Sequence, residues 1–215
     1  MFRGILKGLF FLLFPSECAS CGAPSASGFC RGCLLRLRPL EEPLCRFEEN
    51  FHFDRALACF PYEGRLRKAL HAFKFGRRRH LNAVLGPLMA RLAQRHADRV
   101  DAVASVPMDR GAFKARGFNQ AELLSRAVAK DLGLPDLSRH VRRVRAARPQ
   151  HFLPAAERRA NVAGGFGARP DAFAGRHVLL VDDVLTTGHT ASECAKALKT
   201  SGAVSVTVLA CARAV

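Results

Sequence analysis

Residues 178–190, with the sequence VLLVDDVLTTGHT, form the densest group of chemically capable residues in this chain. Two neighbouring acids, Asp182 and Asp183, follow four apolar residues. Adjacent carboxylates repel each other unless donors or a cation stabilise them, and the hydroxyls of a sugar are suitable donors. The segment after the acids can curl its backbone N–H groups around an anion, because it combines hydroxyl side chains with a glycine: Thr186, Thr187, Gly188, His189 and Thr190. The run therefore predicts a site for a phosphorylated sugar.

The elements around this run have to bring both acids to one place. We expect a buried strand over residues 177–181 and a helix over residues 191–200. Because side chains alternate along a strand, both acids can serve one site only if the strand ends there and the chain turns, and the sequence after the acids predicts that turn. Thr190 and Glu193 have the spacing of a capping box, which predicts a helix start just after the loop, with its positive end toward a phosphate. The alternative is a strand end and a helix cap that bind nothing.

A second group of residues has the spacing of a metal site. Two Cys-x-x-Cys pairs, Cys18 with Cys21 and Cys30 with Cys33, are separated by eight residues. Four thiolates suit a closed tetrahedral Zn²⁺ site, which would be structural and would have no open position for catalysis. A disulfide or redox pair is the alternative, but disulfides are rare in the cytoplasm.

The rest of the chain alternates between predicted strands and helices, which indicates an α/β fold with a mainly parallel sheet covered on both faces. An acidic, proline-containing stretch at 41–50 suits a linker, so we expect a small cysteine module over 1–48 and a main domain over 49–215. We expect a basic loop at 107–117 and a long polar loop at 148–169. The predicted elements are strands at 55–62, 101–106, 140–144, 177–181 and 203–210, and helices at 66–75, 81–97, 119–132 and 191–200.

Composition restricts the classes of partner and compartment. The 34 Lys and Arg residues against 18 Asp and Glu give a formal charge of +16, which favours phosphate-bearing partners unless it is only a generic basic surface. The apolar segment 5–14 is too short to span a bilayer, and it lacks the cleavage site of a signal peptide. We expect a short packing helix there, no membrane span, and a cytoplasmic protein.

The run at 178–190 resembles the phosphoribosyl-diphosphate (PRPP) binding signature of type I phosphoribosyltransferases. Three further segments resemble the competence protein F branch of that superfamily: 106–120 with its Arg-Gly-Phe-Asn-Gln, 150–153 with Gln-His-Phe-Leu, and 158–166 with Arg-Arg-Ala-Asn-Val. With the cysteine module, the resemblance covers nearly the whole chain. In that family further paired cysteines often follow the first four, as in a double zinc ribbon. Here Cys45 has no such partner, which argues against a second zinc.

The resemblance implies a PRPP-type ligand, a type I phosphoribosyltransferase-like fold and a role for each motif. Asp182 and Asp183 would bind the ribose hydroxyls and take part in catalysis, and the loop at 186–190 would bind the 5-phosphate. Mg²⁺ would bridge pyrophosphate and ribose oxygens. The candidate charges toward the pyrophosphate are Arg110, Lys114 and Arg116, the last also as a catalytic residue. Residues 150–159 would close over the site.

Two hypotheses about function remain open at this point. The first is an enzyme that transfers a phosphoribosyl group to an acceptor that the sequence does not identify. The second is a non-catalytic factor that uses the same fold to bind PRPP, a nucleotide or single-stranded DNA. The resemblance implies a role in natural competence and DNA uptake, together with a DNA translocase.

Overall fold

The computed structural model describes residues 17–47, 49–76, 78–144 and 164–214. Its centre is a four-stranded sheet in the order β1-β6-β5-β2, and every neighbouring pair of strands is parallel. The strands are β1 (Arg55–Pro61), β2 (Ala102–Ser105), β5 (His177–Leu185) and β6 (Ser205–Arg213). The longer helices are α3 (Gly64–Phe75), α4 (Asn82–His96), α6 (Gln120–Leu132) and α8 (His189–Thr200). The predicted α/β class with a mainly parallel sheet is confirmed.

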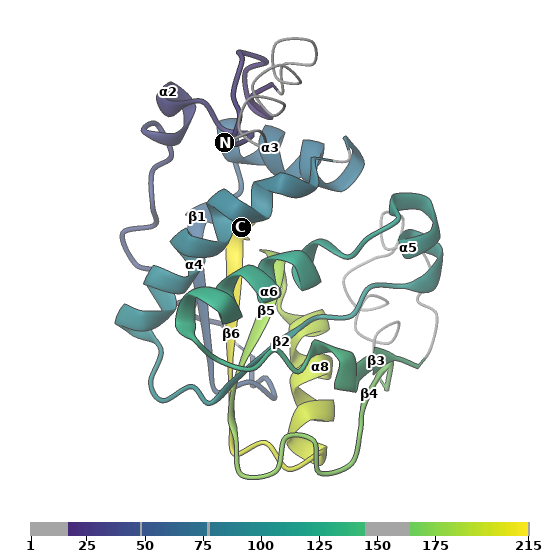
Figure 1. The fold of residues 1–215 in the computed structure, drawn as a ribbon. Coiled ribbons are helices and arrows are strands. Elements are labelled where there is room, and N and C mark those ends of the chain that lie inside the picture. The colour runs from purple at the N-terminus through teal and green to yellow at the C-terminus, as the bar shows by residue number, and fades with distance from the viewer. Residues whose placement is uncertain (1–16, 48, 77, 145–163, 215) are drawn as a thin grey trace, which may run out of the picture.

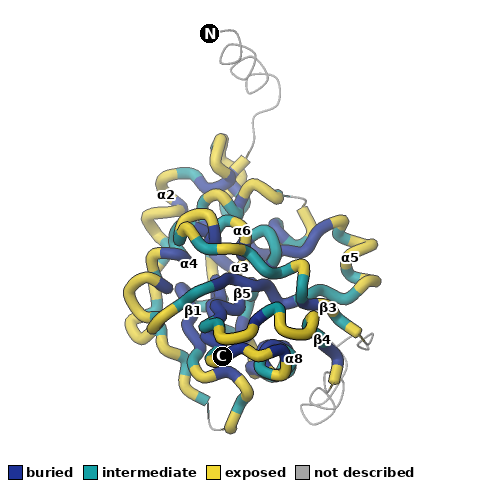
Figure 2. The backbone as a smooth tube through the Cα atoms, turned by 60° about the horizontal axis from the view of Figure 1, so that its bottom comes forward, coloured by how far each residue is buried: buried dark blue, intermediate teal, exposed yellow. Residues whose placement is uncertain are grey.

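Helices cover both faces of the sheet, as the apolar strands require (Figures 1 and 2). Residues of β5 alternate between the two faces: Leu179 and Val181 pack in one core cluster with α3, α4 and α6. Val178 and Leu180 pack in the other cluster, with α8. Because the strands are buried on both sides, only their ends are accessible to a ligand.

Helix α6 starts and ends where the sequence predicts. Asn119 caps α6, since its side-chain oxygen accepts a hydrogen bond from the N–H of Ala121 at 3.1 Å. Gly133 ends the helix in the left-handed conformation, with φ of +67°. Asn119 also donates to the carbonyl of Val106 at 3.0 Å, so the same side chain ties α6 to the end of β2.

The structure corrects two local predictions and confirms a third. The strand β5 continues to Leu185, four residues beyond the predicted end, because it pairs with β6 over that whole length. The predicted basic loop at 107–117 contains a short helix, α5 (Arg110–Arg116), whose N-cap is Asp109. The predicted strand at 140–144 is β3 (Val141–Arg143), which pairs antiparallel with β4 (Phe166–Ala168) in a separate small sheet. The predicted helix at 5–14 and most of the polar loop at 148–169 lie outside the described residues.

The stretch at 41–50, predicted as a linker, is bound to the sheet where the structure describes it. Cys45 donates its N–H to the carbonyl of Ala56 at 2.8 Å, and Ala58 donates to the carbonyl of Pro43 at 2.9 Å. This segment therefore covers the outer edge of β1 with backbone hydrogen bonds, which protects an edge strand from pairing with another chain.

The cysteine segment packs directly on the main domain at the end toward which the strands run (Figure 1). Its short helix α2 (Arg31–Leu34) has Cys30 as its N-cap, and the buried Cys18, Phe29 and Cys33 belong to the same core cluster as α3 and α4. None of the helices in the described ranges has the length and apolarity to cross a bilayer.

Candidate functional site

The two acids lie at the end of β5, but their side chains are on opposite faces of the sheet. Asp183 follows the alternation of Leu179 and Val181 on the α3 face, and Asp182 follows Val178 and Leu180 on the α8 face. The prediction that the strand ends at the acids is therefore wrong, because the strand runs through both of them to Leu185. Any ligand that contacts both carboxylates has to lie across the end of the strand.

Asp183 is buried and forms an ion pair with Lys74 of the last turn of α3, with Nζ and Oδ2 2.8 Å apart. Burial alone would lower the pKa of the Lys74 ammonium, but the attraction of Asp183 outweighs it and the pKa is raised. Sequence reasoning missed Lys74. A signal was available, since Lys74 follows Leu70 by four residues and so lies near the buried face of the helix.

Asp182 has a different environment. Burial raises the pKa of its carboxyl to about 7, and the negative charge of Asp183 adds to the shift. Its Oδ1 accepts a hydrogen bond from the N–H of Asp183 at 2.8 Å, and this hydrogen bond lowers the pKa and so offsets part of the increase. The pair is thus one ion-paired carboxylate beside one acid that titrates near neutral pH, and perturbed groups of this kind are common at functional sites.

The loop after β5 has the features of an anion site. Thr186 and Thr187 are exposed, and Gly188 is the N-cap of α8 with φ of +87°. Because the N-cap is a glycine, no side chain of the described residues caps this helix, and its first N–H groups lack the partner that a capping serine or aspartate would give. His189 and Thr190 lie in the first turn, partly exposed. The predicted phosphate loop therefore leads into a helix start that can bind an anion.

The predicted capping box is wrong. The helix begins at His189, before Thr190, and Glu193 does not reach back to the helix start. Its Oε2 instead accepts a hydrogen bond from the N–H of Gly164 at 2.8 Å. The Glu193 carboxylate therefore binds a segment that is distant in the sequence and does not cap α8.

An aromatic group packs behind this loop. The rings of Phe47, Phe51 and Phe53 lie 5.0 to 5.5 Å from one another, and Phe51 also contacts His189. A Cβ on Gly188 would come within 3.1 Å of Phe47 and 3.2 Å of Phe51. Both the positive φ and the close approach of the rings therefore favour glycine at this position.

Of the three residues predicted to face the pyrophosphate, two line one cavity and the third does not. Arg110 and Lys114 line a cavity of about 390 Å³ at the end of β2, between α5 and the start of α6. Strand β2 is the neighbour of β5 in the sheet, and Val106 donates its N–H to the carbonyl of Val181 at 2.9 Å. Arg116 does not line this cavity; its guanidinium stacks over Phe75 at 5.0 Å.

A second cavity, of about 520 Å³, lies beside the first one and shares Arg139 with it. It is strongly basic, with Arg139, His140, Arg142 and Arg169 among its lining residues. Glu122, in the first cavity, is the one acid that lines either of them among the described residues, and it is paired with Arg126. The two cavities meet at Arg139, and we call them together the basic groove; sequence reasoning had not predicted it.

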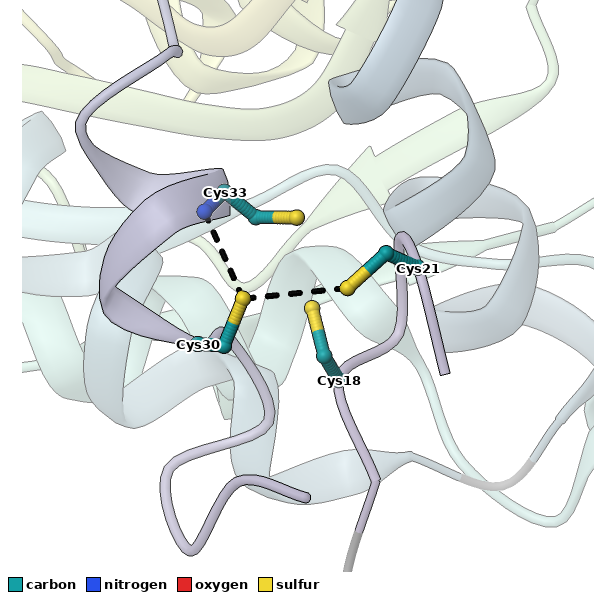
Figure 3. Close-up of side chains that lie close together, drawn as sticks. All are labelled: Cys18, Cys21, Cys30 and Cys33. Atoms are coloured by element: carbon teal, nitrogen blue, oxygen red, sulfur yellow. Dashed lines mark hydrogen bonds between the residues drawn. The ribbon is translucent and has the colours of Figure 1, made fainter. Parts of the chain in front are cut away.

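The four cysteines converge as predicted (Figure 3). Their sulfur atoms all lie within 4.8 Å of one another, and the Cys21 and Cys30 sulfurs are 3.7 Å apart. A tetrahedron with Zn–S bonds of about 2.3 Å has an S–S edge of ~3.8 Å, so the geometry fits a structural zinc. Burial raises the pKa of the Cys18 thiol, but hydrogen bonds from backbone N–H groups outweigh this and bring it to about 6. In the part of the chain that is described, no second cluster of potential ligands accompanies it.

Comparison with known proteins gives the family. Residues 9–48 match the model of the double zinc ribbon domain. The chain is 33% identical over 199 residues to DNA utilization protein YhgH of Escherichia coli, covering 89% of this chain and 81% of that protein. It is 31% identical over 212 residues to competence protein F of Haemophilus influenzae, covering 87% and 91%. The chain belongs to this competence protein F family. The predicted resemblance is thereby confirmed.

A partial similarity to a solved structure accompanies the family match. The glutamine PRPP amidotransferase of B. subtilis is 23% identical and has a TM-score of 0.42, over 60% of this chain. The chain spans only 26% of that enzyme's length. A similarity this partial carries no argument about ligand or reaction for this member of the competence protein F family.

Proposed function

We propose that this protein binds PRPP or another ribose 5-phosphate ligand at the junction of β5 and α8. One observation carries the proposal: the loop after the two acids ends in a glycine N-cap with no side chain to occupy the N–H groups of α8. A phosphate dianion satisfies such groups and is stabilised by the positive end of the helix. Thr186, Thr187 and Thr190 would add hydroxyl donors around it.

The ribose would then lie over the end of β5. Asp182 and Asp183 would accept hydrogen bonds from its two hydroxyls, each from its own side of the strand. Because Lys74 holds Asp183, the ligand has to share that carboxylate with the ammonium or displace it. Asp182 binds hydroxyls best when ionised, which its raised pKa makes dependent on pH near 7.

The pyrophosphate of PRPP would extend toward the end of β2, where Arg110 and Lys114 line the cavity. Among the described residues, only the cysteines form a group of three or more potential metal ligands. The two acids alone are a poor site for Mg²⁺, which keeps several waters and is commonly bound through substrate phosphates. Mg²⁺ would therefore enter with PRPP and neutralise part of its charge.

If the protein turns over, the reaction is displacement of pyrophosphate at the anomeric carbon of the ribose. The bond from C1 to the pyrophosphate oxygen breaks, a bond from C1 to an acceptor nitrogen forms, pyrophosphate leaves with the electron pair, and the proton of the acceptor nitrogen passes to the solvent or to the pyrophosphate. Arg110 and Lys114 would stabilise the negative charge on the leaving group, whereas Arg116, which stacks over Phe75, does not line that cavity. The two acids would hold the ribose and stabilise the positive charge that develops on it.

Calorimetric titration tests the binding. Ribose 5-phosphate, and PRPP with Mg²⁺, are titrated into the wild type and into Asp183→Asn. We expect binding by the wild type and a loss of about tenfold or more in the variant, because charge-assisted hydrogen bonds are strong. Asp98→Asn is the matched control, since Asp98 is exposed and lies two residues after the end of α4. Binding that is equal in the wild type and Asp183→Asn would refute the proposed ribose site.

The basic groove favours a second candidate function, binding of single-stranded DNA. Arg139 and Arg142 would contact phosphates, and Phe113, 47% exposed in the first cavity, could stack on a base. This would suit a role in DNA uptake with a DNA translocase in the cytoplasm, and relatives of this chain are named DNA utilization protein and competence protein. Binding of oligothymidylate that weakens with salt, and that Arg139→Ala with Arg142→Ala abolishes while Asp183→Asn does not, would support it.

A further inference from the structure

Arg213 is the last residue of β6, and its side chain reaches the loop at 186–190, which follows the neighbouring strand β5. Its Nη1 donates a hydrogen bond to the carbonyl oxygen of Thr186 at 2.7 Å. The two residues are brought together by strand pairing, since Arg213 is in register with Leu185, the residue before Thr186. Ala214 adds a backbone hydrogen bond to Leu185 at 2.9 Å.

This bond determines which way one peptide group of the loop faces. In a trans peptide, the carbonyl of Thr186 and the N–H of Thr187 point in opposite directions. When Arg213 holds the carbonyl, the N–H of Thr187 has to point away from the guanidinium. If the peptide were to turn over, an anion in the loop would meet a carbonyl oxygen in place of an N–H donor, which would repel it.

Arg213 is itself held in place. Its guanidinium stacks over the ring of Phe47, with 4.4 Å from Cζ to the ring centroid. Phe47 in turn packs on Phe51 and Phe53 and against Gly188. The planar fork of arginine is suited to stacking and directed hydrogen bonding at the same time, whereas lysine is not.

We propose that Arg213, clamped by Phe47, is a positioning residue that fixes the 186–187 peptide so that the loop presents N–H donors to a phosphate. The role of the loop as a phosphate site rests on the proposed function, but the effect of Arg213 on the loop does not. The two can therefore fail separately. No direct contact between Arg213 and the ligand is required.

The first experiment needs no ligand. Amide hydrogen exchange and backbone amide chemical shifts are compared in wild type, Arg213→Met and Arg91→Met, where Arg91 is an exposed arginine on α4. We expect Arg213→Met to speed exchange and shift the resonances at Thr187 and Gly188, and Arg91→Met to change neither. Phe47→Leu should produce a smaller change of the same kind. If Thr187 and Gly188 are unaffected in a folded Arg213→Met protein, the inference is overturned.

The second experiment uses inorganic phosphate and ribose 5-phosphate as probes. If Arg213 positions the loop, Arg213→Met should weaken the binding of both probes, on the order of tenfold to a hundredfold. The ratio of the dissociation constants of the variant and the wild type should be the same at low and high salt. If Arg213 acted only as a nearby positive charge, salt would screen its effect and the ratio would fall. A ratio that falls toward one as salt increases contradicts the positioning role. Failure of the wild type to bind either probe overturns the proposed function, and the exchange experiment still decides the role of Arg213.

Discussion

Asp182 and Asp183 are neighbours in sequence but have opposite environments. The motif could be predicted from the sequence, because an apolar quartet before two acids and a Thr/Gly loop is specific. Their environments could not, because they depend on how far β5 pairs with β6 and on Lys74, which comes from a distant helix. Local patterns identify the residues, and the tertiary fold determines their charge states.

Asp182 should make the stability of the protein depend on pH. In the folded state its pKa is raised from 3.8 to about 7, so folding takes up a proton between these values. Stability attributable to Asp182 is therefore greatest at low pH and falls as the pH rises through about 7. We expect Asp182→Asn to be more stable than wild type above pH 7, on the order of 1–3 kcal/mol, and equal to it near pH 4. Urea denaturation at several pH values measures this, and a variant destabilised at every pH would contradict it.

Lys74→Met should destabilise the protein because it leaves the Asp183 carboxylate buried without its partner. We expect a loss of about 2–4 kcal/mol in the free energy of unfolding. Lys199→Met is the matched control: Lys199 pairs with Asp54 at the same 2.8 Å, but in an exposed setting. That variant should lose less than about 1 kcal/mol. Equal losses of stability in the two variants would show that the Lys74–Asp183 pair contributes no more than an exposed ion pair.

At the scale of elements, the junction of β5 and α8 decides whether an anion can bind. The sequence predicted a strand, a loop and a helix in this order, and all three are present. It placed the helix cap wrongly because Glu193 is bound to Gly164, which no local rule foresees. It also missed the aromatic group behind the loop, since Phe47 comes from the stretch predicted as a linker and Phe51 directly follows that stretch.

Gly188→Ala tests this junction. The substitution strains a positive φ and pushes against Phe47 and Phe51, so we expect a loss of about 1–2 kcal/mol in stability and weaker phosphate binding. Gly133→Ala is the matched control, because Gly133 has φ of +67° with nothing within 4 Å of the added Cβ. It should lose stability but bind ribose 5-phosphate as the wild type does. Equal phosphate binding by both variants would argue against the junction as the site.

At the scale of the whole molecule, the cysteine module and the sheet share one core. The cysteine spacing predicted the sulfur cluster, and the alternation of elements predicted the parallel sheet. Neither could predict that Cys18, Phe29 and Cys33 pack with α3 and α4, or that residues 43–45 pair with β1. Such contacts depend on shape complementarity between segments that are far apart in the chain.

We predict one zinc ion per chain, measured by metal analysis, and a lower melting temperature when a chelator removes it. Loss of the ion should unfold the cysteine segment and expose its share of the core. Cys21→Ser should lower the zinc content well below one per chain. Cys45→Ser, the control, should leave it at one, because Cys45 lies outside the sulfur cluster. Zinc loss with no change in melting temperature would contradict a structural role.

The most direct test of the proposed sugar-phosphate site is a titration of ribose 5-phosphate followed by backbone amide chemical shifts. The account predicts saturable shifts centred on residues 186–190, with smaller ones at Asp182 and Asp183. Shifts confined to the basic groove around Arg139 and Arg142, or no saturable shifts at all, would contradict it.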